Sequence, residues 1–304
     1  MSYTSQGRKK IGDRRSWRWI RGMDGLHAIF PYIMKRRTDA ECYLHKEVDV
    51  TKLLEYIDRR NEEHKGPDGS IDPQEKVTLF HTLLYMVTKI VMERPQLNSF
   101  IKAKRFYQRD EIILTFVARK RFNDHSEEAL MMLRPPEDYT IGDFTSHVVG
   151  KVHEARTNEE YGIDGALNFL AKLPRPIRLF VQLFIDLGDI FGLLPHVLTD
   201  DDSNHATVLL SNLGSVSCDA VYHHLSNFGT TSIVLTVGVI HKAQKVLPDG
   251  QVAIRDVVNL GITVDERIAD GFYFARSLKL IDHYAEHPEL LEKPLKEDIG
   301  YEFK

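Results

Sequence analysis

The sequence has little cysteine and no long apolar run. Only two of its 304 residues are cysteines, Cys42 and Cys218, and their separation fits neither a disulfide framework nor a metal-binding motif. We therefore expect a reducing, cytoplasmic setting and no bound metal. No stretch of about 18 uninterrupted apolar residues is present, which argues against a membrane-spanning helix. The N-terminus also lacks the apolar core of a signal peptide.

A surplus of positive charge is missing as well. The formal net charge is −4, so nucleic-acid binding is not expected to be the main function. Basic residues gather instead in residues 1–26, which we expect to form an arm in front of one domain, 27–304. The arm is either ordered with solvated charges or bound to a phosphate group or an anionic membrane surface. Its basic residues are Arg8, Lys9, Lys10, Arg14, Arg15, Arg18 and Arg21.

Helical and strand-like patterns alternate irregularly along the chain, which predicts an α+β fold. The clearest helix is expected over 74–93, where apolar residues recur every three or four positions and His81 is interpreted as a packed histidine. A β-hairpin is expected over 98–122, with its turn at Arg109 and Asp110. Further helices are predicted over 51–63, 126–133, 140–160 and 271–287, and strands over 40–50, 208–215, 230–243 and 251–265.

Residues 174–198 form the most apolar segment of the chain. As a helix, the segment would gather its polar residues in one narrow stripe and leave a wide apolar face. Such a face is typically buried against the body or a partner subunit. The alternatives are an interfacial helix or the wall of a pocket for an apolar substrate. The stripe consists of Arg178, Gln182, Asp186 and Asp189.

Charged residues crowd the strand-to-helix corner TVDERIADG, residues 263–271. This stretch resembles the end of a catalytic motif, His-x-x-x-Asp-Gly, of chloramphenicol acetyltransferase and of the acyltransferase cores of 2-oxo acid dehydrogenase complexes. Glu266 stands at the position of the motif histidine. The matching positions are Asp265, Arg267, Asp270 and Gly271.

Three other stretches resemble the same family in the same order. SNLG at 211–214 is similar to a family strand, HKEVDVTKLLEYI to its first core strand and helix, and MERPQLNSFI to the helix end that carries Asn98. Together they cover most of 27–300. The 174–198 segment has no counterpart and is interpreted as an insertion in the acyltransferase-like catalytic domain.

The resemblance implies a chloramphenicol-acetyltransferase-like two-layer sandwich with a mixed sheet, assembled as a homotrimer. Each active site would lie in a channel between two subunits, which coenzyme A or acyl-CoA enters from one end and a small-molecule acyl acceptor from the other. By the same resemblance, Ser211 would donate a hydrogen bond to the tetrahedral oxyanion. Asp270 would hold the corner by pairing with an arginine, or simply cap the helix that follows it.

The exchange of histidine for Glu266 leaves the chemistry open. A histidine that deprotonates a thiol works against about two pKa units, or roughly 2.7 kcal/mol, whereas a glutamate works against about four, or roughly 5–6 kcal/mol. Burial raises the pKa of a glutamate and narrows this gap. A glutamate that stays anionic could instead serve an amine or water as general base. The adjacent pair His223 and His224 offers an alternative base.

Three functional hypotheses follow. In the first, the chain is a CoA-dependent acyltransferase with altered chemistry, with Glu266 as base and Ser211 as oxyanion donor, moving an acyl group to a thiol, hydroxyl or amine. In the second, it is a catalytically inactive relative that acts as a trimeric binding or assembly protein. In the third, the arm and the segment 174–198 form a membrane-surface module.

Overall fold

A computed structural model describes most of the chain. The described residues are 9–14, 16–119, 128–157, 164–191, 193–194, 202–247 and 249–303. Several predicted elements lie partly outside these ranges: the N-terminal arm, the hairpin, the helices predicted over 126–133 and 140–160, and the apolar segment.

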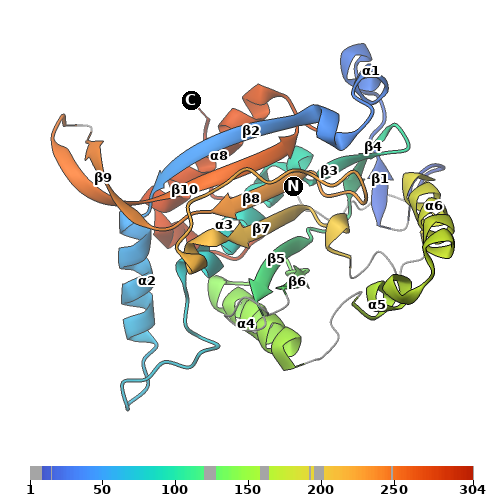
Figure 1. Ribbon diagram of the computed structural model, residues 1–304. Coiled ribbons are helices and arrows are strands. Elements are labelled where there is room, and N and C mark those ends of the chain that lie inside the picture. The colour runs from blue at the N-terminus through green and yellow to red at the C-terminus, as the bar shows by residue number, and fades with distance from the viewer. Residues whose placement is uncertain are drawn as a thin grey trace.

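A mixed seven-stranded sheet forms the centre of the molecule (Figure 1). Its order is β2-β10-β8-β7-β5-β6, with β9 paired to β10. The pairs β5–β7 and β7–β8 are parallel and the other pairs are antiparallel. The strands are β2 Glu41–Asp49, β5 Leu114–Arg119, β6 Glu128–Leu133, β7 Val208–Asn212, β8 Ile233–Val237, β9 His241–Val246 and β10 Val252–Asp265.

The segment predicted as a helix over 126–133 was assigned wrongly, because it forms strand β6. Its residues pair along the whole of β5, with Leu133 opposite Leu114 and Ala129 opposite Ala118. A short apolar run fits a helix and a strand equally well on its own. The neighbouring strand supplies the hydrogen-bonding partner that decides between them.

A second sheet of three strands holds the N-terminal arm. Its order is β1-β4-β3, formed by Trp17–Trp19, Arg105–Arg109 and Ser99–Lys102. The hairpin turn lies at Ala103 and Lys104, whose φ values of 47° and 60° reverse the chain. The predicted turn at Arg109 and Asp110 is therefore wrong, because the chain passes there from the small sheet to the large one. The Trp17 ring packs 4.9 Å from that of Phe100, so the second half of the arm is ordered.

Helices cover one face of the large sheet (Figure 1). Helix α2 has the predicted bounds, whereas α3 begins at Leu79 because the Thr78 hydroxyl caps it by accepting a hydrogen bond from the His81 amide. The covering helices are α2 Thr51–Glu63, α3 Leu79–Glu93, α4 Ile141–Thr157 and α8 Gly271–Glu286; the others are α1 Gly25–Ile33, α5 Asp164–Lys172 and α6 Arg175–Phe191. This arrangement confirms the prediction of an α+β sandwich with a mixed sheet.

The main core lies between these helices and the sheet. It includes the fully buried Leu84, Tyr85, Phe116 and Phe144. The start of the polar C-terminal tail is held on the same body, because the buried Lys89 ammonium donates to the carbonyl groups of Lys293, Pro294 and Glu297. Short 3₁₀ helices complete the fold at Arg37–Ala40, Pro95–Asn98, Ser203–His205, Leu213–Val216 and Pro288–Glu292.

The loop 217–229 crosses the opposite face of the sheet. A Cβ atom added to Gly261 in β10 would lie 2.4 Å from the carbonyl oxygen of Val221 in this loop. Glycine is therefore required at this position, because the loop backbone lies directly on the strand. The Thr236 hydroxyl of the neighbouring strand donates to the same carbonyl group. The loop thereby runs from the end of β7 towards the corner at residues 263–271.

Candidate functional site

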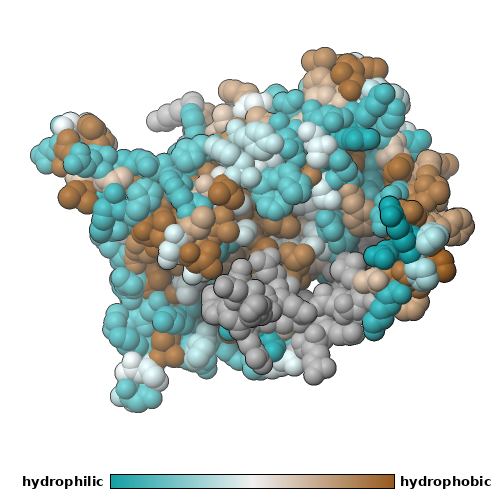
Figure 2. Space-filling view, in the orientation of Figure 1, coloured by the Kyte–Doolittle hydropathy of each residue, from teal (hydrophilic) through white to brown (hydrophobic). Residues whose placement is uncertain are grey.

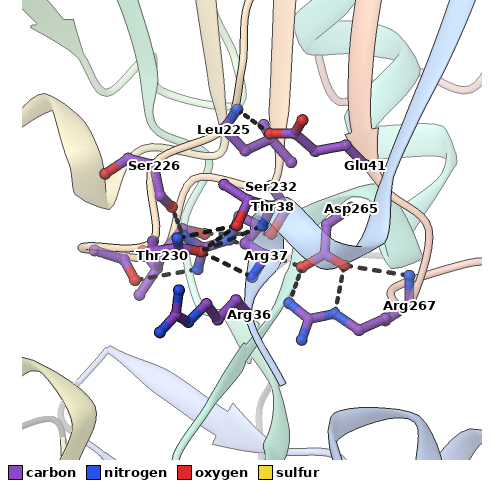
Figure 3. A network of polar contacts seen from close by, with 12 residues as sticks. Arg36, Arg37, Thr38, Glu41, Leu225, Ser226, Thr230, Ser232, Asp265 and Arg267 are labelled. Carbon is purple, nitrogen blue, oxygen red and sulfur yellow. Dashed lines mark hydrogen bonds and ion pairs between the residues drawn. The ribbon is translucent and has the colours of Figure 1, made fainter. Parts of the chain in front are cut away.

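The charged corner is built around the fully buried Asp265 at the end of β10. Its carboxylate accepts hydrogen bonds from Nε of Arg267 at 2.7 Å and from Nη2 at 2.6 Å, and it lies 3.7 Å from Nε of Arg37 (Figure 3). The Arg37 guanidinium donates to the carbonyl groups of Ser226 and Gly229. Asp265 and Arg267 thus pair locally, and together with Arg37 they fix the corner to the end of the loop 217–229.

Two acidic residues at this corner are exposed. Asp270 caps α8, where its carboxylate accepts a hydrogen bond of 2.7 Å from the amide of Tyr273, which confirms the predicted cap. In the described structure no arginine forms an ion pair with Asp270; that role belongs to Asp265. The backbone amide of Glu266 donates to the carbonyl group of Ala40 at 2.9 Å, which fixes its main chain. Its carboxylate has no hydrogen-bonding partner among the described residues.

Ser211 lies near the end of β7 beside a cleft of about 450 Å³. The cleft has an apolar wall from α3, β5 and α4 and two basic side chains, His81 and Arg156. Burial lowers the pKa of His81 to about 4, so its ring is neutral at pH 7, in keeping with the prediction of a packed histidine. The other residues that line the cleft are Thr78, Phe80, Phe116, Val117, Val148, Val152, Asn212, Leu213, Ser215 and Val216.

Ser211 and Glu266 lie far apart within one chain. Ser211 pairs with Thr236 of β8, and Thr236 pairs with Gly261 of β10. Glu266 follows Gly261 by five residues along the strand direction, which corresponds to about 17 Å. The two predicted catalytic residues therefore sit at opposite ends of the sheet and cannot act on one substrate atom within a single chain.

His223 and His224 lie at the Glu266 end of the sheet. Both are exposed, and their rings stack at 4.6 Å. The next residue, Leu225, donates its amide to Glu41, which pairs with Asp265 in the sheet register. The chain thus places this pair near the charged corner and away from Ser211.

Asn98, which stands at a position shared with the resembled family, has a structural role. Its side chain is fully buried and donates 3.0 Å to the carbonyl group of Glu111. It also accepts a hydrogen bond of 2.7 Å from the hydroxyl of Thr207. These contacts join the end of the small sheet to the start of β7.

A second buried polar cluster was not predicted from the sequence. Asp189 of α6 lies 2.5 Å from the Lys102 ammonium and 3.4 Å from Nε2 of His205, and it accepts the Gly229 amide at 3.0 Å. His205 also lies 2.8 Å from Asp202 through Nδ1. The signal in the sequence for this pairing is the position of His205 three residues after Asp202.

The cluster shifts the ionisation of its members. Burial lowers the pKa of Lys102 to about 8. Burial also lowers the pKa of His205, but the neighbouring carboxylates of Asp189 and Asp202 outweigh it and raise the pKa above the usual value. Burial raises the pKa of the Asp189 carboxyl, but the nearby His205 and Lys102 lower it by more. The pKa of Asp189 is therefore below its usual value. Near neutral pH, attraction between the Asp189 carboxylate and the Lys102 ammonium thus holds the cluster together.

Helix α6, the helical part of the apolar segment, contacts the body through the buried Asp189 and the half-buried Val181 and Ile185, whereas the rest of its polar stripe is exposed. Asp189 is buried, whereas Leu179 and Phe184 are 63% and 59% exposed. Of the two expected ways to bury the apolar face, packing on the body is therefore wrong, and packing on a partner subunit stays a prediction. No residue of α6 is among those that line the cleft at Ser211, so α6 does not form a wall of that cleft in its own chain.

In the described ranges, no group of three or more His, Cys, Asp or Glu side chains is arranged to hold a metal ion. The helices of the described chain include none with the length and apolar character needed to cross a membrane.

Comparisons with known proteins confirm the resemblance and the fold. The family 2-oxoacid dehydrogenases acyltransferase (catalytic domain) matches residues 195–292. A curated relative, the lipoamide acyltransferase component of the branched-chain alpha-keto acid dehydrogenase complex of Bacillus subtilis, is 23% identical over 234 residues. This match covers 76% of the chain but only 43% of the relative, so the chain spans less than half of that protein's length.

Solved structures share the fold over nearly the whole chain. A probable dihydrolipoamide acetyltransferase of Listeria monocytogenes is 18% identical with a TM-score of 0.58, covering 91% of this chain and 95% of that one. A dihydrolipoamide acetyltransferase of Azotobacter vinelandii, in whose catalytic mechanism a serine, a histidine and an asparagine were investigated, is 12% identical with a TM-score of 0.58. The match covers 90% of this chain and 94% of the Azotobacter vinelandii chain.

Proposed function

From the fold shared with dihydrolipoamide acetyltransferases, we propose that the chain is an acyltransferase-type core. It moves an acyl group between coenzyme A and a small acceptor with a thiol, hydroxyl or amine group. The chain works as a homotrimer, with Ser211 of one subunit and Glu266 of the next at each site. Support comes from the match to the acyltransferase catalytic domain over residues 195–292 and from the similarity to the Bacillus subtilis lipoamide acyltransferase.

The separation of Ser211 and Glu266 is the observation that carries this proposal. Within one chain they lie at opposite ends of the sheet, about 17 Å apart along the strands. A cyclic trimer brings one end of each subunit against the other end of its neighbour. Both residues then meet at three equivalent interfaces, and neither needs a partner within its own chain.

At such an interface each group has a defined task. The Glu266 carboxylate takes the proton from the acceptor as it attacks the thioester carbonyl group. The Ser211 hydroxyl donates to the oxyanion that forms, which is worth about 10²–10³ in rate at comparable sites. The carbonyl then re-forms, and the departing thiolate of coenzyme A recovers a proton. An amine or water as acceptor suits a glutamate, because a developing thiolate would be repelled by its negative charge.

The second candidate function is a trimeric assembly or binding protein without catalysis. The carboxylate of Glu266 is exposed and has no partner among the described residues, which favours this candidate, because an efficient general base is oriented by neighbouring groups. The buried Asp265 network is retained in either case, since it holds the corner of the fold.

Mixing of two inactive variants tests the proposed site between subunits. Glu266→Gln and Ser211→Ala should each lower acyl transfer from an acyl-CoA substrate, because each removes one half of every site. Co-expression in equal amounts should restore about one quarter of the wild-type activity, since one interface in four combines both intact residues. No recovery in mixed oligomers would contradict a shared site. Successive purification through a different affinity tag on each variant must first establish that the oligomers mix.

The control variants separate the two candidate functions. Glu266→His places the histidine of the resembled motif at the corner, and His224→Gln removes the alternative base without touching Glu266. Calorimetric titration with coenzyme A shows whether the site binds its substrate at all. Unchanged transfer in Glu266→Gln would remove Glu266 from the role of base. Absence of coenzyme A binding in both the wild type and Glu266→His would favour the assembly protein.

A further inference from the structure

Helix α6 leaves a wide apolar face exposed, although it is anchored to the body. The buried Asp189 and the half-buried Val181 and Ile185 face the body, and most of the large apolar side chains point away from it. Figure 2 shows them as a hydrophobic area at the edge of the molecule where Figure 1 places α6. The side chains that are 45–63% exposed are Ile177, Leu179, Phe180, Leu183, Phe184, Leu187, Ile190 and Phe191.

The anchor prevents the helix from turning this face inward. Rotation about the helix axis would withdraw Asp189 from Lys102, from His205 and from the Gly229 amide. The buried ammonium of Lys102 would then lose its carboxylate, which is costly in a site removed from water. The apolar face is therefore held outward by the structure of the body itself.

Positive charges lie at both ends of the apolar face. Lys172, Arg175 and Arg178 are exposed at the start of α6 and in the helix before it. At the other end, Arg14 of the basic arm donates 2.9 Å to the carbonyl group of Phe191. The acidic residues of α6 are Asp189, which is buried, and Asp186, which is exposed and accepts a hydrogen bond from Gln182. The exposed charge beside the apolar face is thus predominantly positive.

We propose that α6 and the basic arm bind the protein to an anionic lipid surface. The helix lies in the plane of the interface, with Phe180 and Phe184 among the acyl chains and the flanking cations at the lipid phosphates. A second copy that docks α6 against α6 fits this surface less well, because such a symmetric contact would bring like charges together. The proposal is independent of the acyl-transfer chemistry.

Co-sedimentation of the full chain with lipid vesicles tests the proposal. The wild type should bind vesicles of phosphatidylcholine mixed with phosphatidylglycerol, and much less those of phosphatidylcholine alone. Phe180→Ser with Phe184→Ser should weaken this binding by about tenfold or more, because the inserted area is lost. Replacement of Lys172, Arg175 and Arg178 by glutamine should weaken vesicle binding by about fivefold for each charge. High salt should also weaken the binding, because it screens the charges.

A matched control uses apolar residues that are exposed elsewhere. Val246 and Ile254, which are 74% and 70% exposed, lie on the β9–β10 hairpin at the far side of the molecule in Figure 1. Val246→Ser with Ile254→Ser should leave vesicle binding unchanged. Both double variants should keep the wild-type melting curve, since they alter exposed side chains.

Three outcomes would overturn the proposal. The first is equal binding to neutral and anionic vesicles, and the second is equal binding by the phenylalanine variant and the wild type. The third is absence of binding in the wild type. A smaller oligomer in the phenylalanine variant, together with absence of lipid binding in the wild type, would identify a second copy of the chain as the occupant of the apolar face.

Discussion

Two buried aspartates hold two different parts of this molecule. Asp265 pairs with Arg267 two residues away and lies beside Arg37, so it fixes a corner that is part of the main body. Asp189 pairs with Lys102 and His205, which are far from it in sequence, and holds a helix whose opposite face is exposed. The comparison separates a carboxylate that maintains the fold from one that mainly sets the position of a peripheral element.

Replacement of Asp265 should produce the largest effect. Asp265→Asn leaves Arg267 and Arg37 buried at 3% and 4% exposure without their carboxylate, which should lower the free energy of unfolding by about 3–5 kcal/mol. Urea denaturation followed by circular dichroism measures this loss. Asp270→Asn in the same corner is the control, because an asparagine also caps a helix and should change stability by less than about 0.5 kcal/mol. Similar losses in both variants would contradict a special role of Asp265.

Replacement of Asp189 should have a smaller and more local effect. Asp189→Asn removes a charged partner from Lys102, which retains a hydrogen bond of 2.8 Å to the Gly229 carbonyl group, so we expect a loss of about 1.5–3 kcal/mol. Hydrogen exchange should accelerate in α6 and remain slow in β10. Asp186→Asn, an exposed change on the same helix, should leave both measurements unaltered. Uniform acceleration across the sheet would show that Asp189 supports the whole fold.

Titration of His205 should produce the smallest effect. The pKa of His205 is raised in the folded chain. Its contribution to the free energy of unfolding is therefore complete below about pH 6.5, the usual pKa of histidine, and is lost as the pH rises through the higher pKa of the folded state. The pKa of Lys102 is lowered to about 8, so the titration of Lys102 increases the free energy of unfolding with rising pH, but only above about pH 8. The free energy of unfolding should therefore fall between about pH 6.5 and pH 8.

The variant His205→Gln tests the source of this pH dependence. Its stability should be flatter than that of the wild type over the same interval when measured by urea denaturation at several pH values. The groups that face His205 are Asp189, Asp202 and the ring of Phe228, and all remain in the variant. An identical pH slope in both proteins would assign the dependence to other residues.

Local sequence determined much of the fold. The apolar periodicity of α2 and the N-cap and periodicity of α8 gave their positions, because N-caps and helix faces depend on residues within a few positions of each other. The cap formed by Asp270 was predictable for the same reason. The resemblance of residues 263–271 and 211–214 to a known family placed these motifs in a fold that the solved structures share.

Tertiary structure decided what depends on distant partners. The residues of β6 became a strand because β5 supplies a hydrogen-bonding edge, which no local pattern specifies. The distance between Ser211 and Glu266 follows from the register of three strands, and the exposed face of α6 follows from the contact of Asp189 with Lys102 and His205. The sequence by itself determined most of the elements and the charged corner, whereas only long-range pairing decided that β6 is a strand, which residues meet and which face of α6 points outward.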